Sequence, residues 1–224
     1  MASLGGVISP QVSAPPRPLL RGWLHTITFP ITVIAGVVLV ATAPTTSAKV
    51  SSAIFVATAA LLFGVSALLH RGHWTPRVES VLRRLDHADI YLIIAGTYTP
   101  IAVLALPPNQ ARLMLAIVWT GAIAGVFFRV FWITAPRWLS TTMYVVTGWV
   151  AILFVNPLID GAGLAAFILI VVGGVLYSVG AVIYATKRPD LVPGVFGFHE
   201  LFHALTVAAF VCHYIAIWIV VHQQ

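Results

Sequence analysis

The chain has 224 residues, of which 60% are hydrophobic and only 8% are charged, and its mean hydropathy is +1.00. Soluble domains carry about 25% charged residues, so this composition excludes a soluble globular protein and indicates an integral membrane protein. The net charge of +6 does not indicate nucleic-acid binding, because the basic residues are dispersed at the ends of apolar segments.

The chain divides into two predicted parts. Residues 1–22 are rich in Pro, Ser and Gly, and we expect a disordered cytosolic tail there rather than a signal peptide. Residues 23–224 contain seven apolar segments, each long enough to cross a bilayer, which needs about 20 helical residues. They lie near 24–43, 50–70, 88–106, 111–132, 140–158, 163–185 and 200–221. The sequence therefore predicts an all-α membrane protein, a seven-helix transmembrane bundle.

The basic residues predict how this bundle is oriented. Ten of the twelve Lys and Arg residues fall in the N-terminal tail and in the loops after the second, fourth and sixth segments. Only Lys49 and Arg112 fall on the other side. Because cytosolic loops carry the excess of Lys and Arg, we expect a cytosolic N-terminus and an outside C-terminus.

Three histidines and one aspartate are predicted to meet at the cytosolic edge of the bundle. His70 ends the second segment, Asp86 opens the third, and His199 and His203 lie in the first turns of the seventh. A spacing of four places His199 and His203 on one helix face. Ionisable groups at membrane depth are costly, so a cluster of them indicates a functional site.

The cluster has the chemistry of a catalytic zinc site. Zinc in such sites is held by three protein ligands and keeps an open position for water, and His70, His199 and His203 supply three imidazoles. Asp86 would hold the water as a base or bind the metal, and Ser66, one turn before His70, would hydrogen-bond a substrate carbonyl or orient the water. The predicted reaction is hydrolysis of an ester or amide in a membrane lipid. The single cysteine, Cys212, excludes a multi-thiolate site, but imidazole also suits nickel, copper and iron.

Other polar residues have simpler interpretations. The letters H-E-x-x-H at 199–203 also fit a metalloprotease motif with Glu200 as base, but Glu200 points about 100° from His199 and suits a helix cap. We interpret Asp89 as an acid of the first helical turn, with a contribution to the site as the alternative. We interpret His213 as a packed polar residue or a separate contact rather than a ligand. Isolated histidines at segment ends are expected at the membrane interface; these are His25, His73 and His87.

Three motifs give the chain a family resemblance. They are S-x-x-x-H at Ser66–His70, L-D-H-A-x-I-Y-L-x-I-A-G-T-Y-T-P at Leu85–Pro100, and H-E-x-x-H at His199–His203. In this order they resemble the bacterial haemolysin III branch of the progestin and adipoQ receptor family, from about Trp23 to the C-terminus.

The resemblance implies a multi-pass protein of the bacterial inner (plasma) membrane with seven helices and a zinc site near the cytosolic face. His70, His199 and His203 would be the ligands, with Asp86 and Ser66 beside the bound water. The wider group includes alkaline ceramidases, which implies lipid amide hydrolysis, and some bacterial members are associated with membrane homeostasis. The chain departs from the family pattern in its first segment. Family members often carry an acidic residue and an Asn shortly before the histidine of that segment, and both are absent ahead of His25.

Three functions compete at this point. The first is a zinc-dependent hydrolase with membrane lipids as substrates. The second is a sensor or receptor of membrane state whose zinc is structural. The third is a pore-forming haemolysin, which the sequence disfavours because a pore needs a polar path through the bilayer and the charges cluster at one edge.

Overall fold

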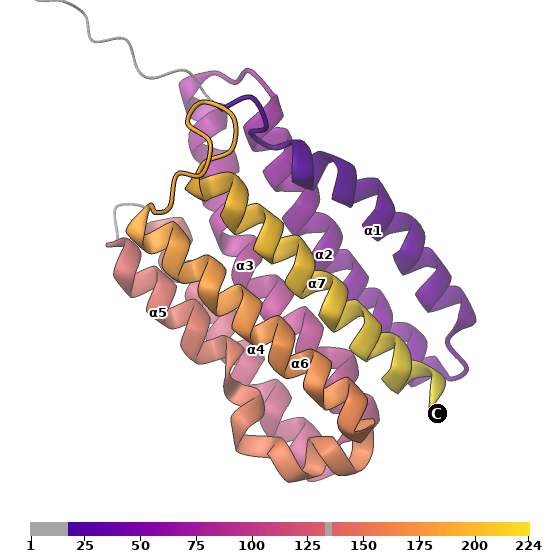
Figure 1. The fold of residues 1–224 in the computed structure, drawn as a ribbon. Coiled ribbons are helices and arrows are strands. Elements are labelled where there is room, and N and C mark those ends of the chain that lie inside the picture. Colours follow the sequence, from indigo (N-terminus) through magenta and orange to yellow (C-terminus); the bar gives the residue numbers. More distant parts are fainter. Residues whose placement is uncertain (1–17, 133–135) are drawn as a thin grey trace, which may run out of the picture.

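The computed structural model describes residues 18–132 and 136–224, which form helices and no β-sheet (Figure 1). Residues 1–17, most of the expected tail, lie outside the described residues. The all-α prediction is confirmed for the described part of the chain. The elements are α1 (Trp23–Thr42), α2 (Thr46–Arg71), α3 (Pro76–Ala105), α4 (Pro108–Phe131), α5 (Arg137–Gly148), the 3₁₀ helix η1 (Val150–Phe154), α6 (Val155–Thr186) and α7 (Phe198–His222).

Length and hydropathy give six candidate membrane spans among the described residues rather than the seven expected. The difference arises because α5, η1 and α6 follow one another without a loop and form a single helical stretch of 49 residues, Trp138–Thr186. This stretch is about twice the length that one crossing requires. With six candidate membrane spans among the described residues, the chain is a multi-pass membrane protein.

The 49-residue stretch reverses direction within α6. Gly163 has φ 81° and ψ 157°, a backbone conformation that is open almost only to glycine, so the helix is interrupted there. Beyond this point α6 returns alongside α5 (Figure 1). The chain thus makes a helical hairpin whose turn follows the predicted break at Asp160–Gly161.

Helix α3 begins earlier than the hydropathy pattern predicts. It starts at Pro76 rather than near residue 88, with Thr75 extended as the N-cap and the proline in the first helical position, where its missing N–H costs nothing. The charged residues between Arg77 and His87 are therefore helical. Hydropathy marks only the membrane-embedded part of a helix, whereas backbone hydrogen bonds continue through polar residues.

Helices α1 and α7 run in the same direction. At one end the amides of Leu19 and Leu20 donate to the carbonyls of Gly194 and Val195, just before α7 begins. At the other end His222 contacts the Thr42 hydroxyl at 3.1 Å. The described chain accordingly begins and ends at opposite ends of the bundle (Figure 1).

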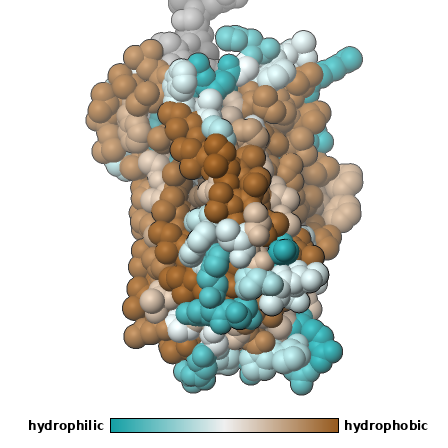
Figure 2. All heavy atoms as spheres, turned by 90° about the vertical axis from the view of Figure 1, so that its right-hand side faces the viewer, coloured by the Kyte–Doolittle hydropathy of each residue, from teal (hydrophilic) through white to brown (hydrophobic). Residues whose placement is uncertain are grey.

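The surface has the polarity of a membrane protein. Figure 2 shows hydrophobic side chains over most of the upper half of one face and along its left side, with hydrophilic ones at the upper end and over much of the lower half. Large apolar side chains such as Ile34, Phe127 and Leu164 are exposed, which suits contact with lipid. The core is packed from Phe55, Tyr91 and many small residues, which let the helices approach closely.

Candidate metal centre

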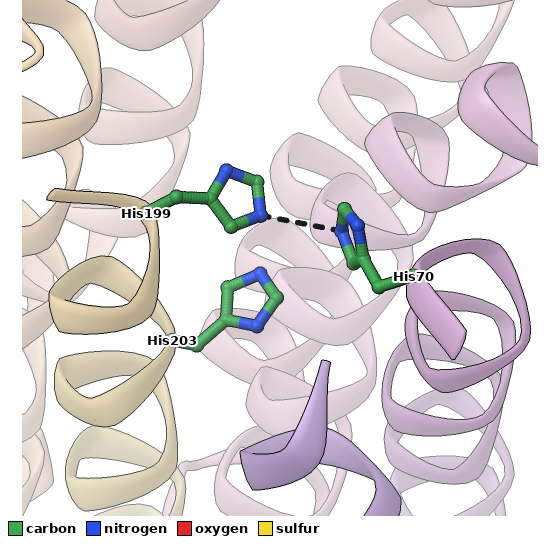
Figure 3. A group of neighbouring side chains, drawn as sticks. All are labelled: His70, His199 and His203. Atoms are coloured by element: carbon green, nitrogen blue, oxygen red, sulfur yellow. Dashed lines mark hydrogen bonds between the residues drawn. The ribbon is translucent and has the colours of Figure 1, made fainter. Parts of the chain in front are cut away.

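The structure brings the three predicted ligand histidines together. His70 lies in the last turn of α2, while His199 and His203 lie one turn apart at the start of α7. Their rings point toward one another across the gap between the two helices (Figure 3). One nitrogen from each ring lies within 4.8 Å of the other two, and the His199 and His70 Nε2 atoms are 3.2 Å apart.

This arrangement fits a tetrahedral metal ion. Zinc–imidazole bonds of about 2.0–2.1 Å place two nitrogens on neighbouring tetrahedral corners about 3.3 Å apart. The observed 3.2 Å between His199 and His70 matches that spacing. The three histidines could therefore hold a metal ion, and three nitrogen donors would leave a fourth position of a four-coordinate ion open.

Ser66 and Asp86 lie beside the histidines. Ser66 is almost fully buried on α2, one turn before His70, and its hydroxyl makes no hydrogen bond with any described residue. The hydroxyl lies close enough to the Asp86 carboxyl on α3 for the two groups to interact, without reaching hydrogen-bond geometry. Both residues line the same cavity as the three histidines, so the polar groups predicted from the sequence surround one space.

Glu200 is engaged elsewhere. Its Oε2 accepts a hydrogen bond from the Gly197 amide at 2.9 Å, and its Oε1 pairs with the Arg21 Nε at 2.5 Å. The side chain is 1% exposed and caps the start of α7, as the cap interpretation predicts. Because both carboxylate oxygens are used, the structure does not favour the metalloprotease interpretation, in which Glu200 would be a free base.

His25 was predicted at the membrane interface, and this prediction is wrong. The ring is 2% exposed and stacks in parallel on His203, with 3.8 Å between ring centroids and 1° between planes. The sequence signal that would have indicated this was its place on the first segment at the same depth as His203.

Two further predictions concern α3 and α7. Asp89 is not in a first turn, because α3 begins at Pro76; it is buried and is not among the residues that line the cavity. His213 is buried, and its Nε2 lies 3.1 Å from the Ile170 carbonyl oxygen. Because a carbonyl oxygen only accepts hydrogen bonds, Nε2 carries the proton and donates this bond. This packing fits the predicted role of His213 as a packed polar residue.

A cavity of about 380 Å³ begins at the metal centre and extends into the bundle. Its polar end includes Arg21, His25 and the predicted site residues. Deeper in the bundle the walls are mainly apolar side chains from α3, α6 and neighbouring elements, among them Ile94, Ile101, Phe167, Ile170 and Val171. Volumes of roughly 300–1,000 Å³ are typical of small-molecule sites. A polar head with an apolar tail is the shape of molecule that such walls suit.

Comparison with known proteins places this architecture in a family. Residues 14–214 match the family described as haemolysin-III related. The chain is 39% identical to Hemolysin-3 of Bacillus cereus over 144 residues, 64% of this chain and 65% of the relative. It is also 39% identical to a Hemolysin-3 homolog of Bacillus subtilis (strain 168) over 139 residues, 62% of this chain and 65% of that relative. The matched region thus spans slightly less than two thirds of each of these relatives.

Proposed function

The chain belongs to the haemolysin-III-related family, and from that premise we propose that it is a zinc-dependent hydrolase of amide or ester bonds in membrane lipids. One observation carries the proposal: three imidazoles within bonding reach of one ion form the polar end of a largely apolar cavity. A lipid bound there would place its carbonyl at the histidines and its acyl chain in the deeper cavity. Membrane lipids are the proposed substrates and partners.

Each polar residue has a role in this proposal. His70, His199 and His203 would hold the metal, which would supply a Lewis acid for polarising a carbonyl and activating water. Asp86 accepts the proton of the attacking water and returns it to the leaving group. The Ser66 hydroxyl, which lies beside the Asp86 carboxyl and makes no hydrogen bond with a described residue, donates a hydrogen bond to the substrate carbonyl oxygen. The apolar walls exclude bulk water and position the acyl chain.

The bundle is proposed to cross the membrane seven times. The support is the length of the 49-residue stretch, the non-helical Gly163 within it, and the parallel course of α1 and α7. Two crossings by this stretch together with five single helices give an odd number, which agrees with chain ends at opposite ends of the bundle. The excess of Lys and Arg at the end that carries the metal centre supports a cytosolic site, a cytosolic N-terminus and an outside C-terminus.

The first test is the metal content of protein purified in detergent. We expect about one zinc per chain in the wild type and its loss in His199→Ala/His203→Ala, since one imidazole cannot hold the ion alone. The matched control is His73→Ala, which removes an exposed histidine near the same end of the bundle. The zinc-loaded wild type is then incubated with ceramides, N-acyl lipids and lysolipids. A folded wild type without bound metal, or a loaded one that hydrolyses none of these lipids, would contradict the proposal.

A second function is favoured by the position of the cluster. The ligands come from α2 and α7, so a bound ion would join two helices that are far apart in the sequence. A sensor of membrane state with a structural zinc would use this link. It differs from the hydrolase in one measurable respect: chelation would lower the melting temperature and no lipid would be turned over.

The names of the relatives suggest the third function, a pore. Hemolysin-3 is the printed name of the Bacillus cereus protein. Protein-dependent leakage of a trapped dye from liposomes that persists in His199→Ala/His203→Ala would favour a pore over the hydrolase. We expect no such leakage, because most charged residues of the described chain lie near the ends of the helices, whereas a pore needs a polar path through the bilayer.

A further inference from the structure

His25 is a fourth imidazole at the centre. It lies in the first turn of α1 and is held between two rings, parallel to His203 at 3.8 Å and edge-on to Phe63 at 5.0 Å. The start of α1 is itself fixed. Arg21 pairs with Glu200 of α7, and Gly22 lies so close to α2 that a Cβ there would be 2.7 Å from the His70 Cβ. The His25 ring therefore has little freedom to move away from the metal centre.

The nitrogens of His25 are not explained by this packing. Neither Nδ1 nor Nε2 makes a hydrogen bond with any described residue, and both are buried. Leaving a buried polar group without a partner costs about 1–3 kcal/mol. A phenylalanine would stack against His203 and Phe63 without that cost. A histidine in this position indicates that the nitrogens bind a group supplied by another molecule.

The cavity identifies the class of that group. His25 lines the cavity at its polar end, together with Ser66, Asp86 and the three ligand histidines. A neutral imidazole presents one donor and one acceptor, which complements a carbonyl oxygen, an amide N–H or a hydroxyl. We propose that His25 is a binding residue for the polar head of the molecule held in this cavity, an acyl amide, ester or hydroxamate-like group. This inference rests on the proposed metal centre and adds a fourth imidazole, one that binds the ligand rather than the ion.

The experiment uses the full chain loaded with cobalt(II), whose visible absorption reports on molecules bound to the ion. Acetohydroxamate is titrated into wild type, His25→Phe and His25→Gln. Phenylalanine preserves the stacked ring and removes both nitrogens, whereas glutamine restores a donor and an acceptor. We expect all three to bind cobalt equally, with acetohydroxamate affinity roughly tenfold weaker in His25→Phe, as the loss of about one hydrogen bond implies, and recovered in part in His25→Gln. The control is His73→Phe, which changes an exposed histidine and is expected to match wild type.

The outcomes separate this inference from the proposed function. A folded wild type that takes up no cobalt would contradict the metal centre itself. Cobalt uptake with equal acetohydroxamate affinity in wild type and His25→Phe would overturn the role of His25 and leave the metal centre standing. If His25→Phe does not fold, the same comparison is made between His25→Gln and His25→Leu, and equal affinity in that pair would overturn the role as well.

Discussion

Asp86 and Asp89 are two acidic residues one turn apart on α3 with different surroundings. Asp86 lines the cavity beside Ser66, whereas Asp89 is buried and outside the cavity lining. If Asp86 transfers the proton, Asp86→Asn should lower turnover of any lipid that the wild type hydrolyses by about 10²-fold or more while zinc content stays the same. Turnover is measured by product release and zinc by atomic absorption.

The matched control for this prediction is Asp89→Asn, the same change one helical turn away. We expect it to retain turnover, since its carboxyl does not reach the cavity. Loss of zinc from Asp86→Asn alone would instead make Asp86 a metal ligand. Equal losses of turnover in the two variants would show that the position of the carboxyl relative to the cavity does not matter.

At the scale of residues, the sequence predicted that His70, His199 and His203 lie together, but not that His25 lies beside them. His199 and His203 are spaced by one helical turn, and His70 ends a segment at the same depth, so periodicity and topology were enough. His25 is near no other histidine in the sequence. Its stacking on His203 depends on the packing of α1 against α7, which hydropathy does not encode.

At the scale of elements, the Arg21–Glu200 pair joins the residues before α1 to the start of α7. Arg21→Ala should lower the stability of the detergent-solubilised protein by about 3 kcal/mol, because it leaves a buried carboxylate without its charge partner. Thermal unfolding followed by circular dichroism measures the effect. The control is Arg83→Ala, which breaks the exposed pair with Glu79 and should change stability by about 1 kcal/mol or less. Similar melting temperatures for the two variants would mean that the Arg21–Glu200 pair contributes no more to stability than the exposed Arg83–Glu79 pair.

The hairpin of α5 and α6 depends on close packing at Gly161. A Cβ at this position would lie 1.7 Å from the Ala105 carbonyl oxygen, so backbone rather than a flexible side chain would have to move. We expect Gly161→Ala to cost about 1–3 kcal/mol. Gly148→Ala is the matched control, because a Cβ there meets nothing within 4 Å. A neutral Gly161→Ala, judged by its melting temperature beside that control, would show that α6 does not pack this closely against the end of α3.

The elements were predicted unevenly, for reasons that can be stated. Turn residues such as Pro44 and Pro107 mark the ends of α1 and α3 within a few residues, because proline and small polar residues end helices. The start of α3 was missed by about three turns, since its first residues are charged and fall outside any apolar window. The break near Asp160–Gly161 was predicted, but not that the chain reverses inside α6 at Gly163, because composition does not reveal the conformation of a single glycine.

At the scale of the whole molecule, the proposed topology makes a prediction about three exposed positions. Trp138 begins the 49-residue stretch, Asp160 lies near its turn, and Leu191 follows its end. If the stretch crosses the membrane twice, Trp138 and Leu191 face the cytosol and Asp160 faces outside. Cysteines are placed singly at these positions in a Cys212→Ala background and treated with a membrane-impermeant maleimide in intact cells. We expect labelling at Asp160→Cys alone, with the other two labelled only after lysis.

The result decides both the number of crossings and the side on which the metal centre lies. Leu191 lies in the α6–α7 loop next to the start of α7, which carries His199 and His203, so protection of Leu191→Cys would place the centre at the cytosolic face. Labelling of Leu191→Cys and Trp138→Cys with protection of Asp160→Cys would keep two crossings but invert the bundle, against the distribution of Lys and Arg. If only one of Trp138→Cys and Leu191→Cys were labelled in intact cells, the two ends of the stretch would lie on opposite sides of the membrane. The stretch would then cross the membrane once, and the number of crossings would be six. A cytosolic centre would place the polar end of the cavity, which the histidines line, at the depth of the inner leaflet.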